Sequence, residues 1–277
     1  METSFWIFVL LGFVAQIIDG GVGMGFGIIT NTVLLSLGIP PVVSSASVHT
    51  AGIFTSGLSG LSHWRLGNIN KKLFLTLVFP GIIGAFIGSR LMQALPRHIL
   101  KPAIGAYLLI IGIILLYRAF KMPSEDNLAS KYPPFGWIMY GLLTLLKWGP
   151  FKKVAEMPTQ FLEGLALTGG SLDAIGGGGW GPIVTSILLL KEQEPRTSIG
   201  SVNAAEFFVA LTTSITLFAG FPSKSQQTII GGLILGGMVA APLGAFALRF
   251  ISKRVLLFIV GGVMTTLTTF NLLYNWL

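Results

Sequence analysis

The sequence consists mainly of apolar runs close to the length of about 20 residues that an α-helix needs to cross a bilayer. Only 10% of the 277 residues are charged, whereas a soluble domain carries about 25%. The outside of the fold must therefore face an apolar medium. We predict an all-α membrane protein, because a backbone surrounded by lipid has to satisfy its hydrogen bonds within helices.

The apolar runs form two groups. Those of the first group are 5–18, 24–37, 43–62, 73–95 and 102–120, and those of the second are 135–146, 159–172, 179–190, 198–219, 227–248 and 255–276. The run 135–146 is too short to span a bilayer, and we interpret it as an interfacial helix that precedes Lys147, Lys152 and Lys153. The predicted organisation is a first transmembrane repeat over 1–120, a linker over 121–158 and a second transmembrane repeat over 159–277.

Both groups carry a similar glycine-rich motif. Asp19-Gly-Gly-Val-Gly-Met-Gly-Phe-Gly27 aligns without gaps on Asp173-Ala-Ile-Gly-Gly-Gly-Gly-Trp-Gly181. The same register pairs Pro41 with Pro195, and Ser47-Val-His-Thr-Ala with Ser201-Val-Asn-Ala-Ala. We infer two homologous repeats, each with a glycine-broken re-entrant helix pair and three transmembrane helices.

The positions of Lys and Arg favour an inverted arrangement of the repeats. If each glycine-rich motif enters and leaves the membrane on one face, 14 of the 18 Lys and Arg fall on one side, whereas full crossings divide them 10 to 8. Cytoplasmic loops are enriched in these residues. The hairpin arrangement is therefore preferred, and it places both termini outside the cell.

The charge and the missing residue types exclude several functions. The net charge of +8 comes from residues in loops between apolar runs, so we expect a lipid bilayer and no nucleic acid as partner. There is no cysteine for thiolate chemistry. No Gly-x-Ser-x-Gly or His-Glu-x-x-His motif occurs, and Ser47 and His49 are too close in sequence to face each other on a helix. We predict neither an enzyme nor a cofactor.

The glycine-rich motifs are the first candidate for a binding site. Irregular backbone at membrane depth is tolerated only where it is buried in protein or lines a wet cavity. A helix follows each motif, and its free amides and positive dipole end would attract an anion. The candidate substrate-binding residues here are Gly23, Gly25, Phe26, Gly178, Gly179, Trp180 and Gly181. Alternatively, the glycines only permit close packing.

Polar side chains within the apolar runs are the second candidate, because they are costly in a membrane. Asp19 and Asp173 start the two motifs, and each either caps the broken backbone or carries a proton. For Glu206 we favour a functional role such as proton coupling. His49 is either a substrate ligand or a packed polar residue. Further candidate substrate-binding groups, with helix–helix hydrogen bonding as the alternative, are Ser47, Ser201 and Asn203.

The two motifs and Ser201-Val-Asn-Ala-Ala-Glu206 resemble the sulfite exporter TauE/SafE family of membrane transporters. The similarity covers nearly the whole chain and is weakest over 121–158. The resemblance implies transport of sulfur-containing anions, such as sulfite or sulfoacetate, in a bacterial or archaeal inner membrane. By motif match it assigns functional positions to Asp19, 20–27, Asp173, 176–182 and 201–206.

We therefore expect a secondary transporter for a small organosulfur or sulfur oxyanion, working by alternating access, with proton coupling as an option. The alternative is a cation or metal-ion permease whose ligands are Asp19, Asp173, Glu206 and His49. Their spacing matches no metal motif, and we predict no metal site. The sequence leaves the substrate, the direction, the coupling ion and the oligomeric state open, a homodimer included.

Overall fold

The computed structural model describes residues 2–22, 24–65, 67–121, 157–191, 195–218, 222–247 and 253–273, and these residues are almost entirely helical, with no strand among them. The first half contains α1 (Glu2–Val22), α2 (Phe26–Ser36), α3 (Pro41–Arg65), α4 (Lys71–Ala94) and α5 (Arg97–Lys121). The second half contains α8 (Thr159–Gly176), the π-helix η1 (Gly181–Thr185), α9 (Ser186–Leu190), α10 (Pro195–Leu217), α11 (Lys224–Ala247) and α12 (Lys253–Asn271). The predicted all-α class agrees with the described part of the chain.

Each glycine-rich motif interrupts a pair of helices. In the first, α1 ends at Val22 and α2 begins at Phe26. In the second, α8 ends at Gly176, because Gly177 and Gly178 have φ angles of 68° and 149°. Residues with a side chain rarely adopt such positive φ angles. The chain then turns back along α8, so that Gly169 faces both Trp180 and Val184. Pro182 lies in the first turn of η1, where a missing amide leaves no helical hydrogen bond unmade.

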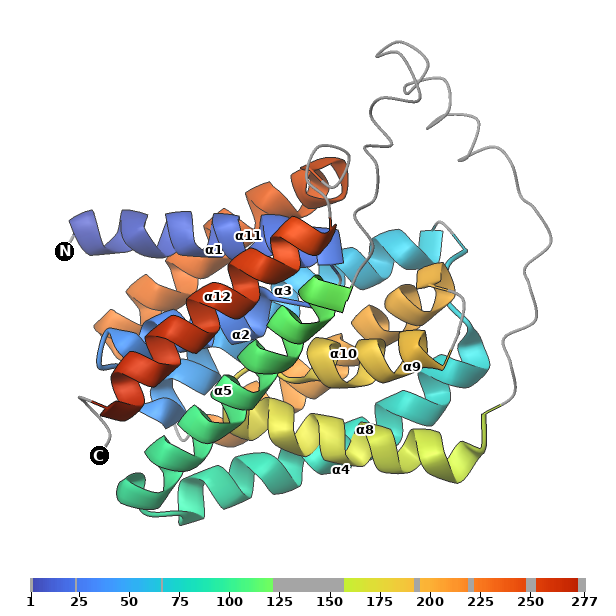
Figure 1. The fold of residues 1–277 in the computed structure, drawn as a ribbon, viewed down its shortest axis with the longest axis horizontal. Coiled ribbons are helices and arrows are strands. Elements are labelled where there is room, and N and C mark those ends of the chain that lie inside the picture. The colour runs from blue at the N-terminus through green and yellow to red at the C-terminus, as the bar shows by residue number, and fades with distance from the viewer. Residues whose placement is uncertain are drawn as a thin grey trace, which may run out of the picture.

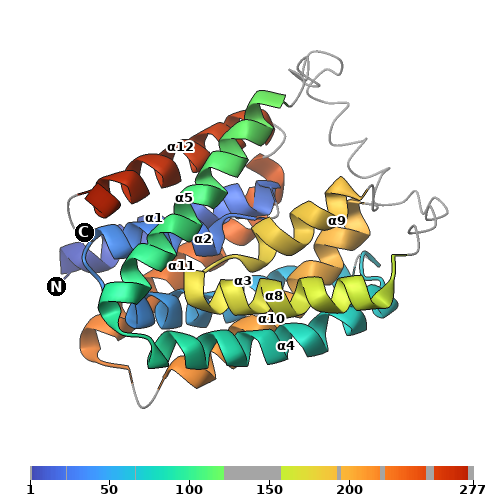
Figure 2. The same ribbon diagram turned by 60° about the horizontal axis from the view of Figure 1, so that its bottom comes forward.

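The packing of the helices relates the two halves to each other (Figures 1 and 2). Helix α1 packs on α11, and α8 packs on α4. Helix α3 packs on α10, and α5 packs on α12. In the repeat register, α1 corresponds to α8, α3 to α10, α4 to α11 and α5 to α12. Exchanging corresponding helices turns the pair α1–α11 into the pair α8–α4, and it leaves the pairs α3–α10 and α5–α12 unchanged. In Figure 1, α1 begins and α12 ends on the same side of the molecule. Two related halves account for this pattern, and the inverted repeat stays a prediction.

Glycine brings the paired helices into backbone contact. A Cβ on Gly12 would lie 2.6 Å from the Leu233 carbonyl oxygen, at the contact of α1 with α11. A Cβ on Gly84 would collide with the Leu167 carbonyl, at the contact of α4 with α8. The abundance of glycine therefore serves close helix packing in both halves.

Two helices of the described part, Lys71–Ala94 and His98–Lys121, are long and apolar enough to cross a bilayer. Their apolar side chains include exposed residues such as Phe79, Ile110 and Phe120. Shorter apolar helices cover Phe5–Asp19, Phe26–Ser36 and Leu257–Asn271. Three crossings per half remain a prediction. The predicted interfacial helix at 135–146 and most of the linker at 121–158 lie outside the described residues.

Candidate functional site

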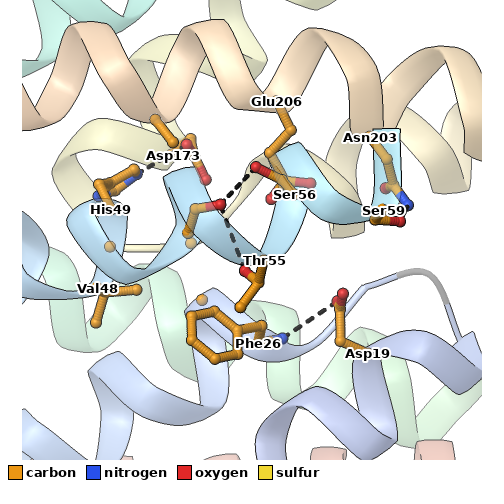
Figure 3. Close-up of a pocket in the computed structure, with 15 residues that line it drawn as sticks. Asp19, Phe26, Val48, His49, Thr55, Ser56, Ser59, Asp173, Asn203 and Glu206 are labelled. Carbon is orange, nitrogen blue, oxygen red and sulfur yellow. Dashed lines mark hydrogen bonds and ion pairs between the residues drawn. The ribbon is translucent and has the colours of Figure 1, made fainter. Parts of the chain in front are cut away.

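A cavity lies where the two glycine-rich motifs meet the middle of α3 and α10 (Figure 3). The space between the lining residues amounts to about 420 Å³, a figure that includes space open to solvent. In Figure 3, Glu206 and Asn203 project from α10 toward α3, and Phe26 and Asp19 lie on the other side of α3. The cavity is thus built by both halves of the chain.

The backbones of the two motifs touch at the cavity. A Cβ on Gly27 would lie 2.6 Å from the Gly178 Cα, and a Cβ on Gly178 would collide with the backbone of Gly27. Both residues line the cavity. Only glycine at both positions allows this approach, so the sequence motif places the two helix breaks against each other.

Asp173 holds the second motif together. Its Oδ1 accepts hydrogen bonds from the amides of Gly179, at 2.6 Å, and Trp180, at 2.9 Å. Its Oδ2 lies 2.9 Å from His49 Nε2, with both side chains buried. These contacts are those of a backbone cap. The amides of Gly179 and Trp180, which we expected to be free for a substrate, are therefore taken up by Asp173.

His49 and Asp173 together carry no net charge. His49 Nδ1 lies 2.8 Å from the Ser45 carbonyl oxygen, which can only accept, so this nitrogen carries a proton. The 2.9 Å contact between Nε2 and the carboxylate then holds one further proton. Whichever of the two atoms carries that proton, the pair is neutral as a whole. It therefore adds polarity to the cavity without adding a net charge.

Asp19 holds the first motif less tightly. Its Oδ1 accepts a 3.2 Å hydrogen bond from the Phe26 amide, and in the described part of the chain no basic side chain pairs with it. The amides of Gly27 and Ile28, in the first turn of α2, make no hydrogen bond to a described residue. The 11-residue helix α2 thus begins beside the cavity with amides that have no partner among the described residues.

Seven of the predicted site residues line the cavity, namely Asp19, Phe26, His49, Asp173, Gly178, Asn203 and Glu206. The predicted site residues that lie outside its lining are Gly25, Ser47, Gly179, Trp180, Gly181 and Ser201. Gly23 lies outside the described residues.

Two of the residues outside the lining have evident structural contacts. The Trp180 side chain is fully buried and donates to the Val202 carbonyl at 3.0 Å. Ser201 accepts a 2.9 Å hydrogen bond from the Asn70 amide and thereby ties α10 to the start of α4. Their packing role corresponds to the alternative that the sequence left open.

The sequence reasoning missed three hydroxyl residues of α3 that line the cavity, Thr55, Ser56 and Ser59. Thr55 and Ser56 donate to the Gly52 carbonyl, at 3.4 and 2.6 Å. Ser59 accepts a 2.9 Å hydrogen bond from Asn203 Nδ2. Ser56 and Ser59 lie seven and ten residues after His49, which places them on the same face of the helix, and this spacing was the available signal for these two residues. Thr55, six residues after His49, does not follow this spacing.

The acidic residues do not form a metal centre. Among the described residues, no group of three or more His, Cys, Asp or Glu is arranged to hold a metal ion. The cavity instead offers hydroxyls, an amide side chain and backbone donors that no other described residue accepts from. Such groups bind a small polar solute by hydrogen bonds.

Comparisons with known proteins agree with this architecture. The family model of the sulfite exporter TauE/SafE matches residues 8–271. The probable membrane transporter protein YtnM of Bacillus subtilis (strain 168) is 32% identical over 274 residues, which are 98% of this chain and 83% of that protein. Sulfite exporter TauE/SafE family protein 3 of Arabidopsis thaliana is 35% identical over 103 residues, which are 37% of this chain and 21% of that protein. No solved structure matches the chain.

The family match covers nearly the whole chain and includes both glycine-rich motifs. The relatives' names describe membrane transporters and not enzymes. The chain therefore belongs to the sulfite exporter TauE/SafE family of membrane transporters.

Proposed function

We propose that the protein is a secondary transporter that moves a small organosulfur or sulfur oxyanion, such as sulfite or sulfoacetate, across the cytoplasmic membrane of a bacterium or archaeon. The observation that carries this proposal is the contact of Gly27 with Gly178 beside a cavity in the middle of α3 and α10. Substrate sites of secondary transporters recur where broken helices of two repeats meet near the bilayer midplane.

The first motif supplies the anion-binding groups in this proposal. The amides at the start of α2, which have no partner among the described residues, and the positive end of its dipole favour an anion. Ser59 already accepts a hydrogen bond from Asn203, so its own proton is available to a substrate oxygen. The neutral His49–Asp173 pair borders the site without repelling the anion.

One difference between matching positions supports alternating access. In the repeat register His49 corresponds to Asn203, and Asp173 corresponds to Asp19. His49 contacts Asp173, whereas Asn203 contacts Ser59 instead of Asp19. In the state with the opposite access, we propose that Asn203 moves to Asp19 and that His49 releases Asp173. The two halves would then exchange roles, and the cavity would open to the other side.

A second candidate is a cation carrier, which one observation favours. Three carboxylates, those of Asp19, Asp173 and Glu206, line the cavity. Two observations argue against a cation carrier. Asp173 is used as a backbone cap, and among the described residues no cluster is arranged to hold a metal ion.

A thermal-shift panel on the purified protein in detergent separates the two candidates. The panel contains sulfite, sulfoacetate, methanesulfonate, sulfate, phosphate, carboxylates and divalent cations. A ligand at about 100 times its Kd adds about 2.7 kcal/mol to the free energy of unfolding. We expect stabilisation by sulfur oxyanions. Stabilisation by cations alone would contradict the proposal and would favour the cation carrier.

A further inference from the structure

Glu206 differs from the other two carboxylates of the cavity in its contacts. Asp173 binds two amides and His49, and Asp19 interacts with the amides of Phe26 and Gly25. The Glu206 carboxylate makes no hydrogen bond or ion pair with a described residue, although it lines the cavity at the middle of α10. An ionised group at membrane depth without a partner is costly. A proton removes that cost, and an anion that binds next to Glu206 makes protonation more favourable, because two negative charges repel each other.

The groups that surround Glu206 do not neutralise it. Helix α1 contributes Asp19 to the cavity, α3 contributes His49 and α8 contributes Asp173. His49 and Asp173 form the neutral pair described above. The remaining charged side chains of the helices packed on α10, among those described, lie at or near helix ends: Arg65, Lys71, Lys72, Arg90, Glu163 and Lys191. With Asp19 and Glu206 both ionised, the cavity carries negative charge and repels an anion.

We infer that Glu206 takes up one proton when the substrate anion binds and carries it across the membrane with the anion. The inference rests on the proposed function and assigns its coupling group. The protonated carboxyl removes one negative charge and presents an O–H donor to a sulfonate oxygen. In the repeat register the matching residue is Gly52, so only one such carboxyl is present. We therefore expect one coupled proton per anion.

The test is the pH dependence of binding, measured by titration calorimetry between pH 6 and 8. The probes are sulfoacetate and methanesulfonate, because their charge does not change in this range. Binding linked to one proton weakens the affinity by about tenfold per pH unit wherever Glu206 is ionised before binding. We expect this slope in the wild type, a flat profile in Glu206→Gln, and the wild-type slope in Glu163→Gln, whose side chain is exposed on α8.

A second measurement, on the wild-type protein, tests the role of Glu206 if Glu206→Gln does not fold. Proton uptake is measured with a pH dye in weakly buffered wild-type protein, and infrared difference spectra monitor the carbonyl stretch of a protonated carboxyl. We expect about one proton per bound probe and the appearance of that stretch. Binding without proton uptake, or a wild-type slope in Glu206→Gln, would overturn the inference and leave the anion site intact. Failure of the wild type to bind either probe would overturn the proposed function and the inference with it.

Discussion

The two glycine-rich motifs share a sequence pattern but differ in how their backbone is satisfied. In the second motif, Asp173 takes the amides of Gly179 and Trp180 and is itself held by His49. The phenol of Tyr107 from α5 lies against Gly176 and Gly179, so that a Cβ on either residue would collide with it. This motif is closed by its own side chains and by α5.

The first motif is more open. Asp19 takes the Phe26 amide at 3.2 Å and also interacts with the Gly25 amide, and the amides of Gly27 and Ile28 have no partner among the described residues. A Cβ on Gly25 would meet its nearest neighbour at 3.5 Å, an ordinary contact distance. This difference is the basis of the division of roles that we propose, in which the second motif supports the structure and the first motif binds the anion.

The largest effect is expected where the two motifs touch. Gly178→Ala introduces a Cβ into the backbone of Gly27 at a φ of 149°, so we predict loss of the folded protein, measured by monodisperse yield in detergent. Gly38→Ala is the matched control, because Gly38 has a φ of 79° but open space around it. It should cost only about 1–3 kcal/mol of backbone strain. Equal effects of the two variants would contradict the account of the contact.

The next largest effect separates the two aspartates. Asp173→Asn removes one partner of a buried pair and should lower the free energy of unfolding by about 3–5 kcal/mol. Asp19→Asn keeps an oxygen for the Phe26 amide and should cost about 1 kcal/mol. Thermal unfolding in detergent measures both. Similar losses in the two variants would show that the motifs are equally supported.

A smaller effect concerns binding by α3. Ser59→Ala removes a hydroxyl that we assign to the substrate, and one hydrogen bond to a charged group contributes about 1.5–3 kcal/mol. We therefore expect sulfoacetate to bind about tenfold or more weakly, measured by calorimetry. Ser62→Ala is the control, because that exposed hydroxyl bonds only to the Leu58 carbonyl. Unchanged affinity in Ser59→Ala would remove Ser59 from the site.

The smallest effect is expected at Gly25, which the sequence placed among the substrate-binding residues. Its φ of 169° is extended, and an added Cβ makes only ordinary contacts. Gly25→Ala should therefore leave substrate affinity and thermal stability close to those of the wild type. A large loss of affinity would mean that the backbone at Gly25 approaches the substrate directly.

The sequence predicted the helical class and the breaks at both glycine-rich motifs, because glycine and apolar length act locally. Seven of the residues that it proposed for the site line the cavity. It could not show that Asp173 takes the amides of Gly179 and Trp180 while the Gly27 amide has no partner among the described residues. Nor could it single out Thr55, Ser56 and Ser59, because serine and threonine also occur in helices that only pack against each other.

The most direct test of the division of roles is a cryo-electron microscopy structure of the protein with sulfoacetate bound. The account predicts the sulfonate at the start of α2, in contact with the Gly27 amide, Ser59 and Glu206, and Asp173 still bonded to Gly179 and Trp180. A sulfonate bound to the amides of Gly179 and Trp180, with Asp173 displaced, would contradict it.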